Sequence, residues 1–124
     1  MQRYDPLRAP DPEAWLALDE QKRIELVRDY HRRARIRLPN AKVHAVMHAI
    51  VETQIAHGDE TPARTAQRLM NDGLDRHETI HAIASVLLGF MYDLMKAPKL
   101  GTASNAPYFA ALERFTVEDW RRAQ

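Results

Sequence analysis

Apolar residues recur at three- and four-residue steps along most of the chain, and this is the period of an α-helix with one buried face. The first long stripe consists of Ile24, Val27, Tyr30 and Ala34. It predicts a helix from Asp19 to about Ile36, because aspartate is a favourable N-cap and Pro39 stops the helix.

Two further stripes predict the longest helices of the protein. One consists of Val43, Met47, Ile50 and Gln54. It lies between Asn40, a typical N-cap, and Gly58, a typical C-terminal glycine, so we expect a helix over about 40–57. The other consists of Ile80, Ile83, Leu87, Met91 and Leu94. It predicts the most apolar helix, over about 75–96, which ends before Pro98.

Shorter helices are predicted around these. Asp11-Pro12 and Thr61-Pro62 each place an N-cap residue before a proline at the first helical position. Residues 107–114 predict another short helix, and Thr116 opens a last turn. No useful stretch alternates with the period of two that marks a strand.

We therefore expect an all-α protein, with residues 1–124 forming a single domain folded as a compact bundle of four to five helices. Helix 75–96 should lie at its centre, packed on helix 40–57, since both carry wide apolar faces. Residues 1–10 should form an extended arm and residues 97–106 a loop. The expected core contains Leu26, Val27, Val46, Ile50, Leu69, Ile80, Ile83, Leu87 and Met91.

Composition narrows the functional classes. The chain has no cysteine, so neither a disulfide nor a thiolate metal site is available. Its formal net charge of +1 gives no global attraction to nucleic acid or to a membrane surface. The longest uncharged run, 79–92, is too short to span a bilayer, and the charged N-terminus does not resemble a signal peptide. We expect a cytoplasmic protein without membrane association.

Four of the six histidines form two pairs with a spacing of four residues. The pairs are His44 with His48, and His77 with His81. One helical turn separates the members of each pair, so their imidazoles can converge on a divalent transition metal. Glu52 lies one further turn after the first pair, whereas His31 and His57 lie near helix ends without such a partner.

The second pair also matches a catalytic motif, since residues 77–81 read H-E-T-I-H. In zinc peptidases with H-E-x-x-H the glutamate is the general base, which makes Glu78 the candidate catalytic residue of a hydrolytic alternative. Two observations speak against a peptidase. No third ligand follows at a familiar distance, and Glu78 has a structural role as the third residue after the N-cap Asp75.

Two interpretations of the histidines remain open. In the first, His44, His48, His77 and His81 bind zinc or another divalent transition metal that prefers imidazole, with Glu52 or Glu78 as a ligand or as a partner of one. In the second, the histidines are neutral groups at the margin of the core that hydrogen-bond to carboxylates or to the backbone. The second interpretation needs nothing beyond helix packing, and for that reason the sequence favours it.

A basic run consists of Arg32, Arg33, Arg35 and Arg37. It can contact phosphates, as a nucleic-acid accessory protein would. Cations at the end of a helix also complement its dipole, and no aromatic platform for bases accompanies the run. Nucleic-acid binding is therefore the weaker alternative.

Several motifs resemble a family of short bacterial helical proteins that is known only as a domain of unknown function. They are Val43-His44-x3-His48-x3-Glu52-x-Gln54 and the later Arg76-His77-Glu78-x2-His81-Ala82-Ile83. The resemblance covers about residues 13–95. It implies helices and a histidine cluster, but no activity.

The function that the sequence favours is a non-catalytic interaction or structural domain, with a metal-binding protein, hydrolytic or not, as the alternative. Helix 75–96 is apolar nearly all round, since Leu88, Phe90 and Tyr92 lie beside its core stripe. A chain of this size has few helices to cover that surface, so we also expect a homodimer with an isologous interface.

Overall fold

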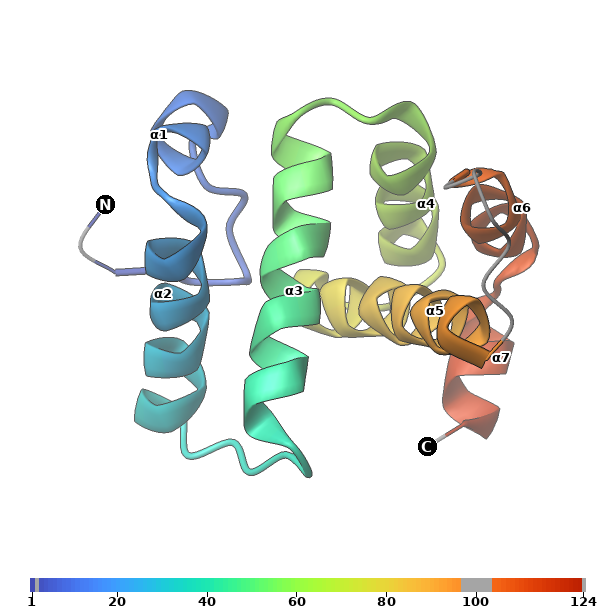
Figure 1. Cartoon of the computed structure of the whole chain (residues 1–124). Coiled ribbons are helices and arrows are strands. Elements are labelled where there is room, and N and C mark those ends of the chain that lie inside the picture. The colour runs from blue at the N-terminus through green and yellow to red at the C-terminus, as the bar shows by residue number, and fades with distance from the viewer. Residues whose placement is uncertain (2, 97–103, 124) are drawn as a thin grey trace.

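The computed structural model describes residues 1, 3–96 and 104–123, and these contain seven α-helices and no strand (Figure 1). The helices are α1 Pro12–Ala17, α2 Glu20–Arg33, α3 Ala41–Ala56, α4 Glu60–Asn71, α5 Arg76–Lys96, α6 Ala106–Arg114 and α7 Val117–Arg122. The all-α fold class is confirmed. More helices form than the expected four to five, because α1 and α7 are separate helices of only six residues each. Of the predicted loop 97–106, residues 97–103 lie outside the described residues.

The helices α2 and α3 lie side by side, and α5 crosses α3 at a steep angle (Figure 1). The helices α4 and α6 pack on α5 and on each other, and α7 follows α6. Residues 3–10 contain no helix or strand and pass between α2 and α3 before α1 begins. The expected packing of the 75–96 helix on the 40–57 helix is therefore present as α5 on α3.

Side-chain caps fix where several helices begin. The carboxylates of Asp11 and Asp19 accept from the backbone N–H groups of Ala14 and Lys22, which satisfies donors that a helix N-terminus leaves free. Asp75 accepts in the same way from the N–H of Glu78, at 2.7 Å. The predicted start of the most apolar helix thus has the expected cap.

Two predicted boundaries are wrong by a few residues. The helix expected to reach Ile36 ends at Arg33, because Arg35 has a φ of 58° and the chain turns there in the left-handed region. The helix expected to start at Thr61-Pro62 starts at Glu60, which puts Pro62 at its third position. Proline is tolerated there because the N–H groups of the first turn have no partner within the helix.

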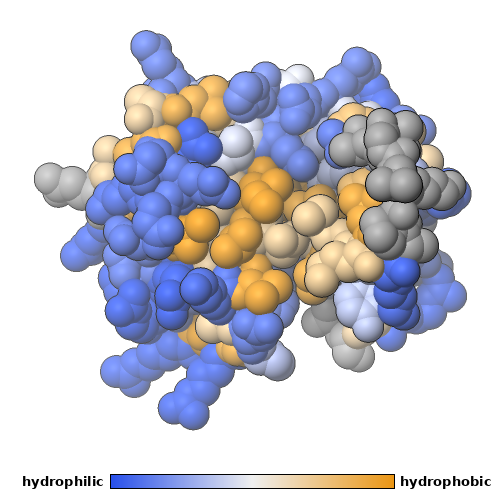
Figure 2. Space-filling view, viewed as in Figure 1, coloured by the Kyte–Doolittle hydropathy of each residue, from blue (hydrophilic) through white to orange (hydrophobic). Residues whose placement is uncertain are grey.

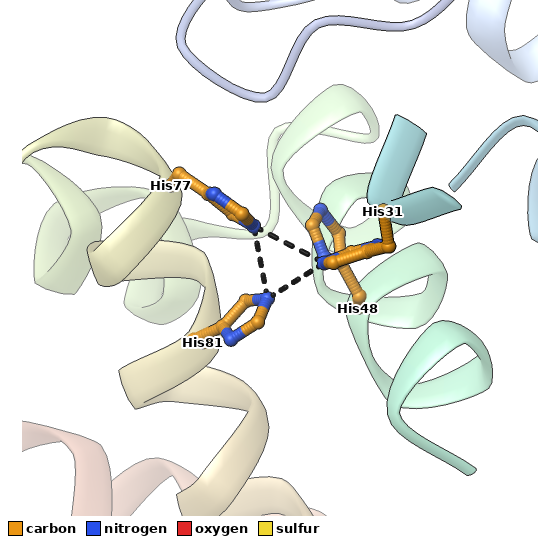
Figure 3. Close-up of side chains that lie close together, drawn as sticks. All are labelled: His31, His48, His77 and His81. Atoms are coloured by element: carbon orange, nitrogen blue, oxygen red, sulfur yellow. Dashed lines mark hydrogen bonds between the residues drawn. The ribbon is translucent and has the colours of Figure 1, made fainter. Parts of the chain in front are cut away.

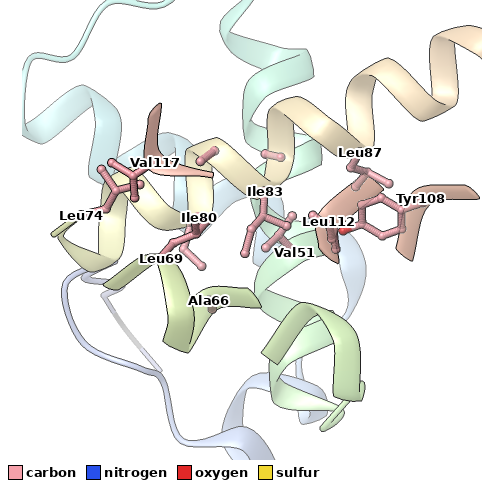
Figure 4. Packing of buried hydrophobic residues seen from close by; sticks show 12 residues of the cluster. Val51, Ala66, Leu69, Leu74, Ile80, Ile83, Leu87, Tyr108, Leu112 and Val117 are labelled. Atoms are coloured by element: carbon pink, nitrogen blue, oxygen red, sulfur yellow. The ribbon is translucent and has the colours of Figure 1, made fainter. Parts of the chain in front are cut away.

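The core consists of two clusters. The larger one joins α3, α4, α5, α6 and α7 around residues such as Val51, Leu69, Ile80 and Leu112 (Figure 4). The smaller one joins the N-terminal segment to α1, α2 and α3 around Tyr4, Trp15, Leu26, Val27, Ala45 and Ala49.

Most of the predicted core is buried, with one clear exception. Leu26, Val27, Leu69, Ile80, Ile83 and Leu87 are buried, whereas Val46 and Ile50 are partly buried. Met91 is 39% exposed, which corrects the sequence prediction. The reason is that α5 extends past α3, so its last turns are covered on fewer sides than its first (Figure 1).

Hydrophilic side chains cover most of α2 on the face shown in Figure 2, and apolar atoms gather over α3 and α5. Within the described residues, no helix has the length and apolar character needed to cross a membrane.

Candidate metal centre

The side chains of four histidines from three helices converge on one point (Figure 3). His31 comes from the last turn of α2, His48 from the middle of α3, and His77 and His81 from the first two turns of α5. Each offers one ring nitrogen, and these four atoms all lie within 4.8 Å of one another. The group, called the histidine cluster below, could hold a metal ion.

Three of the ring nitrogens form a tight triangle. The Nε2 atom of His77 lies 3.0 Å from Nε2 of His81 and 3.2 Å from Nε2 of His31, and the remaining side, between His31 and His81, is 3.2 Å. His48 completes the cluster, because its ring centroid lies 5.3, 5.5 and 5.2 Å from those of His31, His77 and His81, nearly equidistant from all three.

The sides of the triangle and the distances between the rings match a tetrahedral site. Four nitrogen ligands at about 2.0–2.1 Å from a zinc ion lie about 3.3 Å from one another, and their imidazole centroids lie about 5.2 Å apart. The triangle has sides of 3.0–3.2 Å, and the six centroid distances within the cluster run from 4.4 to 5.5 Å. The cluster therefore has nearly the size of a loaded four-histidine site.

The tautomer of His31 follows from its hydrogen bond to the backbone. Its Nδ1 lies 2.8 Å from the carbonyl oxygen of Val27, one turn earlier on α2. A carbonyl only accepts, so Nδ1 carries the proton, and Nε2 of the neutral ring presents a lone pair to the cluster. Metal-binding histidines typically have such a second partner, which orients the ring.

Hydrogen bonds that link His48 to Tyr4 and Tyr4 to Glu52 orient the ring of His48. The hydroxyl of Tyr4 donates to the carboxylate of Glu52, so its oxygen is free to accept from Nε2 of His48, at 2.8 Å. This arrangement places the proton of His48 on Nε2 and leaves a lone pair on Nδ1. The side chain of His48 is buried, and its Nδ1 has no hydrogen-bond partner among the described residues.

The carboxylate of Glu52 is held from the other side by Arg76. Two guanidinium nitrogens of Arg76 donate to its two oxygens, at 2.9 and 2.5 Å. Both side chains are shielded, with 11% of Arg76 and 1% of Glu52 exposed. A paired geometry of this kind compensates two charges that would be costly to bury alone.

Hydrogen bonding cannot satisfy the triangle of Nε2 atoms. Each contact needs one N–H donor and one lone pair, and a neutral imidazole offers only one of these at Nε2. With any choice of tautomers, at most two of the three contacts pair a donor with an acceptor, and the third joins two like groups. A cation at the centre removes the conflict, because all the lone pairs then face a positive charge.

Burial keeps these imidazoles neutral. It lowers the pKa of His31 and of His77, and it lowers that of His81 to about 3, with the neighbouring histidines adding to the effect at His81. Burial, followed by repulsion from the other three histidines, holds the pKa of His48 well below its usual range. A histidine that binds a metal must also be deprotonated, and the four rings have that form here.

Three of the four predicted histidine ligands, His48, His77 and His81, lie in the cluster. His44 does not belong to it. Its half-buried ring lies outside, stacked beside that of His81 with 6.2 Å between the centroids. Its place is taken by His31, which the sequence analysis left without a partner and which contacts both His77 and His81.

The two predicted glutamates have other partners or positions. Glu52 is engaged by Arg76 and Tyr4, so it acts behind His48 rather than in the group of converging ligand atoms. Glu78 is exposed and also lies outside that group. The arrangement therefore has the paired histidines of H-E-x-x-H without a glutamate among the converging atoms.

The structure also brings in a residue that the sequence analysis did not consider. Tyr4 belongs to the segment without regular structure, where no periodic pattern marks a buried side chain, yet it is 2% exposed. His31 carried a weak signal, because it follows the buried Val27 by one helical turn and so shares its face.

The basic run lies at the end of α2 and in the following turn, and its four arginines are exposed. Arg32 pairs with Asp29 at 2.7 Å, and Arg33 donates to the carbonyl oxygen of Tyr4 at 3.3 Å. These contacts give two of the arginines local partners, and phosphate binding by the run stays a prediction.

Comparison with protein-family models, with curated proteins and with solved structures finds no match for this chain.

Proposed function

We propose that this protein is a non-catalytic helical protein that binds one divalent transition metal ion through His31, His48, His77 and His81. The observation that carries the proposal is the convergence of four neutral imidazoles, with three Nε2 atoms 3.0–3.2 Å apart and all four ligand atoms within 4.8 Å of one another. The unpaired, buried Nδ1 of His48 supports it, since such an atom is costly without a partner.

Zinc is the ion that fits best. It accepts four nitrogen ligands in a tetrahedron, whereas copper(II) and nickel(II) favour tetragonal arrangements. The cluster contains no carboxylate, and the chain has no cysteine, which disfavours ions that require oxygen or sulfur ligands.

The proposed role of the ion is structural. Four protein ligands leave no open position for substrate, which is the arrangement of structural rather than catalytic zinc sites. The contacts of Glu52 with Arg76 and Tyr4 also disfavour a hydrolytic site, because this carboxylate is not free to act as a base. The ion would link α2, whose buried apolar side chains lie in the smaller cluster, to α5, whose buried apolar side chains lie in the larger one.

We also propose that two chains associate through α5. The support is a set of large apolar side chains that remain exposed along its second half. They are Leu88, Met91, Tyr92, Leu94 and Met95, with exposed fractions of 36–80%. Apolar side chains gathered on one helix commonly mark an interaction site.

The test of the metal proposal is a zinc titration of untagged, chelator-treated protein against a chromogenic competitor. We expect one high-affinity site per chain. Zinc at about a hundred times its dissociation constant should raise the free energy of unfolding by about 2.7 kcal/mol. A protein with no zinc uptake and no thermal shift would leave the histidines as hydrogen-bonding groups at the margin of the core.

A further inference from the structure

The N-terminal segment, residues 3–8, contacts the histidine cluster through Tyr4. The ring of Tyr4 packs on Trp15 and on His48, with centroid distances of 5.3 and 5.5 Å. Arg76 donates to the carbonyl oxygen of Pro6 at 3.0 Å, and Arg33 donates to that of Tyr4. The segment is thus attached to α2, α3 and α5, the helices that supply the four histidines.

One hydrogen bond joins this segment to a histidine of the cluster, and it is made by the hydroxyl of Tyr4 with His48. The Tyr4 oxygen lies between Nε2 of His48 and the carboxylate of Glu52. The carboxylate of Glu52 is also held by Arg76 and only accepts, so the hydroxyl of Tyr4 directs its proton to Glu52. The hydrogen bond between His48 and Tyr4 then needs a proton on Nε2 of His48, so Nδ1 of the neutral ring carries a lone pair and no proton.

Without the Tyr4 hydroxyl, His48 has no such constraint. Its proton can reside on Nδ1, and that tautomer blocks the nitrogen that faces the cluster. Glu52 would also lose the neutral donor between it and His48. The contact therefore selects the tautomer that binds metal, in the way that carboxylate and carbonyl partners do at known histidine sites.

We propose that Tyr4 is a positioning residue of the metal site, and that ion binding holds residues 3–8 in place on α2, α3 and α5. The inference rests on the proposed metal binding. Coupling between two events is reciprocal: if the docked segment raises the affinity for the ion, then the ion favours the docked segment by the same factor. The fraction of chains in which the N-terminal segment is docked should therefore rise when the metal site is filled.

The first test compares two Tyr-to-Phe variants. Tyr4→Phe removes the hydroxyl and keeps the packed ring. Tyr108→Phe is the matched control, because Tyr108 is also buried, at 1% exposure, and belongs to the larger apolar cluster, where its hydroxyl donates to Gln54 and not to a histidine. We expect Tyr4→Phe to weaken zinc binding by about 10- to 100-fold and Tyr108→Phe to leave it within about twofold.

The outcomes separate the two proposals. If the wild-type chain takes up no zinc, the proposed function fails. If the wild type binds zinc and Tyr4→Phe binds it within about twofold of the wild type, the positioning role alone is overturned. An equal loss in Tyr108→Phe would also overturn it, because the effect would then come from general destabilisation.

A second test uses the wild-type chain and needs no variant. Trypsin cleavage after Arg8 should slow at least about tenfold when zinc is added, following the coupling factor. Cleavage after Arg122, an exposed residue in α7, is the internal control and should not change. Equal cleavage after Arg8 with and without zinc would contradict the coupling of the segment to the ion.

Discussion

The Nε2 atoms of His31 and His81 lie 3.2 Å apart, although the two residues are separated by 50 positions in the chain. This contact links the end of α2 to the second turn of α5. The contact makes His31 the fourth member of the histidine cluster, whereas the paired spacing along the chain favours His44.

The two candidates can be separated by a pair of alanine variants. His31→Ala should weaken zinc binding by more than about a hundredfold, since even the loss of a partner behind a ligand costs about 10- to 100-fold. His44→Ala should leave the affinity within about twofold, because the ring of His44 only stacks beside His81. A competition titration of both variants measures the difference. The reverse ranking would return His44 to the site and remove His31.

The stability of the metal-free protein should depend on pH in a specific window. The pKa of each histidine in the cluster is lowered in the folded chain, to about 3 for His81. In the unfolded chain the pKa of a histidine lies near 6.5, so between these values the unfolded state binds protons that the folded state does not.

The free energy of unfolding should therefore fall as the pH is lowered from about 7 to 5, by up to about 1.4 kcal/mol per pH unit for each histidine that stays neutral. Above about pH 7 these groups should contribute no pH dependence. Urea unfolding of the apo protein across this range measures the slope, and His81→Ala should make it shallower. A stability that rises on acidification over this range would contradict the lowered pKa values of the cluster.

The ion pair between Glu52 and Arg76 should be important for folding because it is buried. Replacing Glu52 by alanine leaves the guanidinium of Arg76 without its partner, which should cost about 3–5 kcal/mol. Glu60 is the matched control, since its pair with Arg64 is exposed, and Glu60→Ala should cost less than about 1 kcal/mol. Denaturant unfolding compares the two. Similar small losses in both variants would mean that the buried pair has little role in folding.

The proposed association through α5 predicts a concentration-dependent dimer. Sedimentation at tens of micromolar protein, a concentration at which weak dimers form, should show a species of twice the chain mass. Tyr92→Glu should shift it to the monomer, because that side chain is 57% exposed and a charge there opposes burial. Gln21→Glu, at an exposed position on α2, adds the same charge away from α5 and serves as the charge control. A strictly monomeric wild type would contradict the proposal.

Much of the fold follows from local pattern, because caps and apolar stripes act within one helix. Asp19, Asn40 and Asp75 cap helices as their side chains predict. The end of α2 could not be predicted from this local pattern, because Arg35 adopts a positive φ and no glycine or asparagine stands there to indicate it.

The site could be predicted only in part, for a related reason. The spacing of His77 and His81 shows that their rings share a face, and the structure places both in the cluster. Spacing says nothing about which other helix supplies a further ligand, and His31 joins the cluster through the packing of α2 on α3. Tyr4 lies in a segment without periodicity, so its contact with His48 depends on tertiary structure alone.

The most direct measurement of the central claim is X-ray absorption at the zinc edge on the loaded, untagged protein. We expect one zinc per chain with four nitrogen ligands at about 2.0–2.1 Å and the outer-shell scattering of imidazole rings. His31→Ala should reduce the imidazole contribution, and His44→Ala should not change it. A zinc shell dominated by oxygen, or a spectrum that responds to His44→Ala and not to His31→Ala, would contradict a metal centre built from His31, His48, His77 and His81.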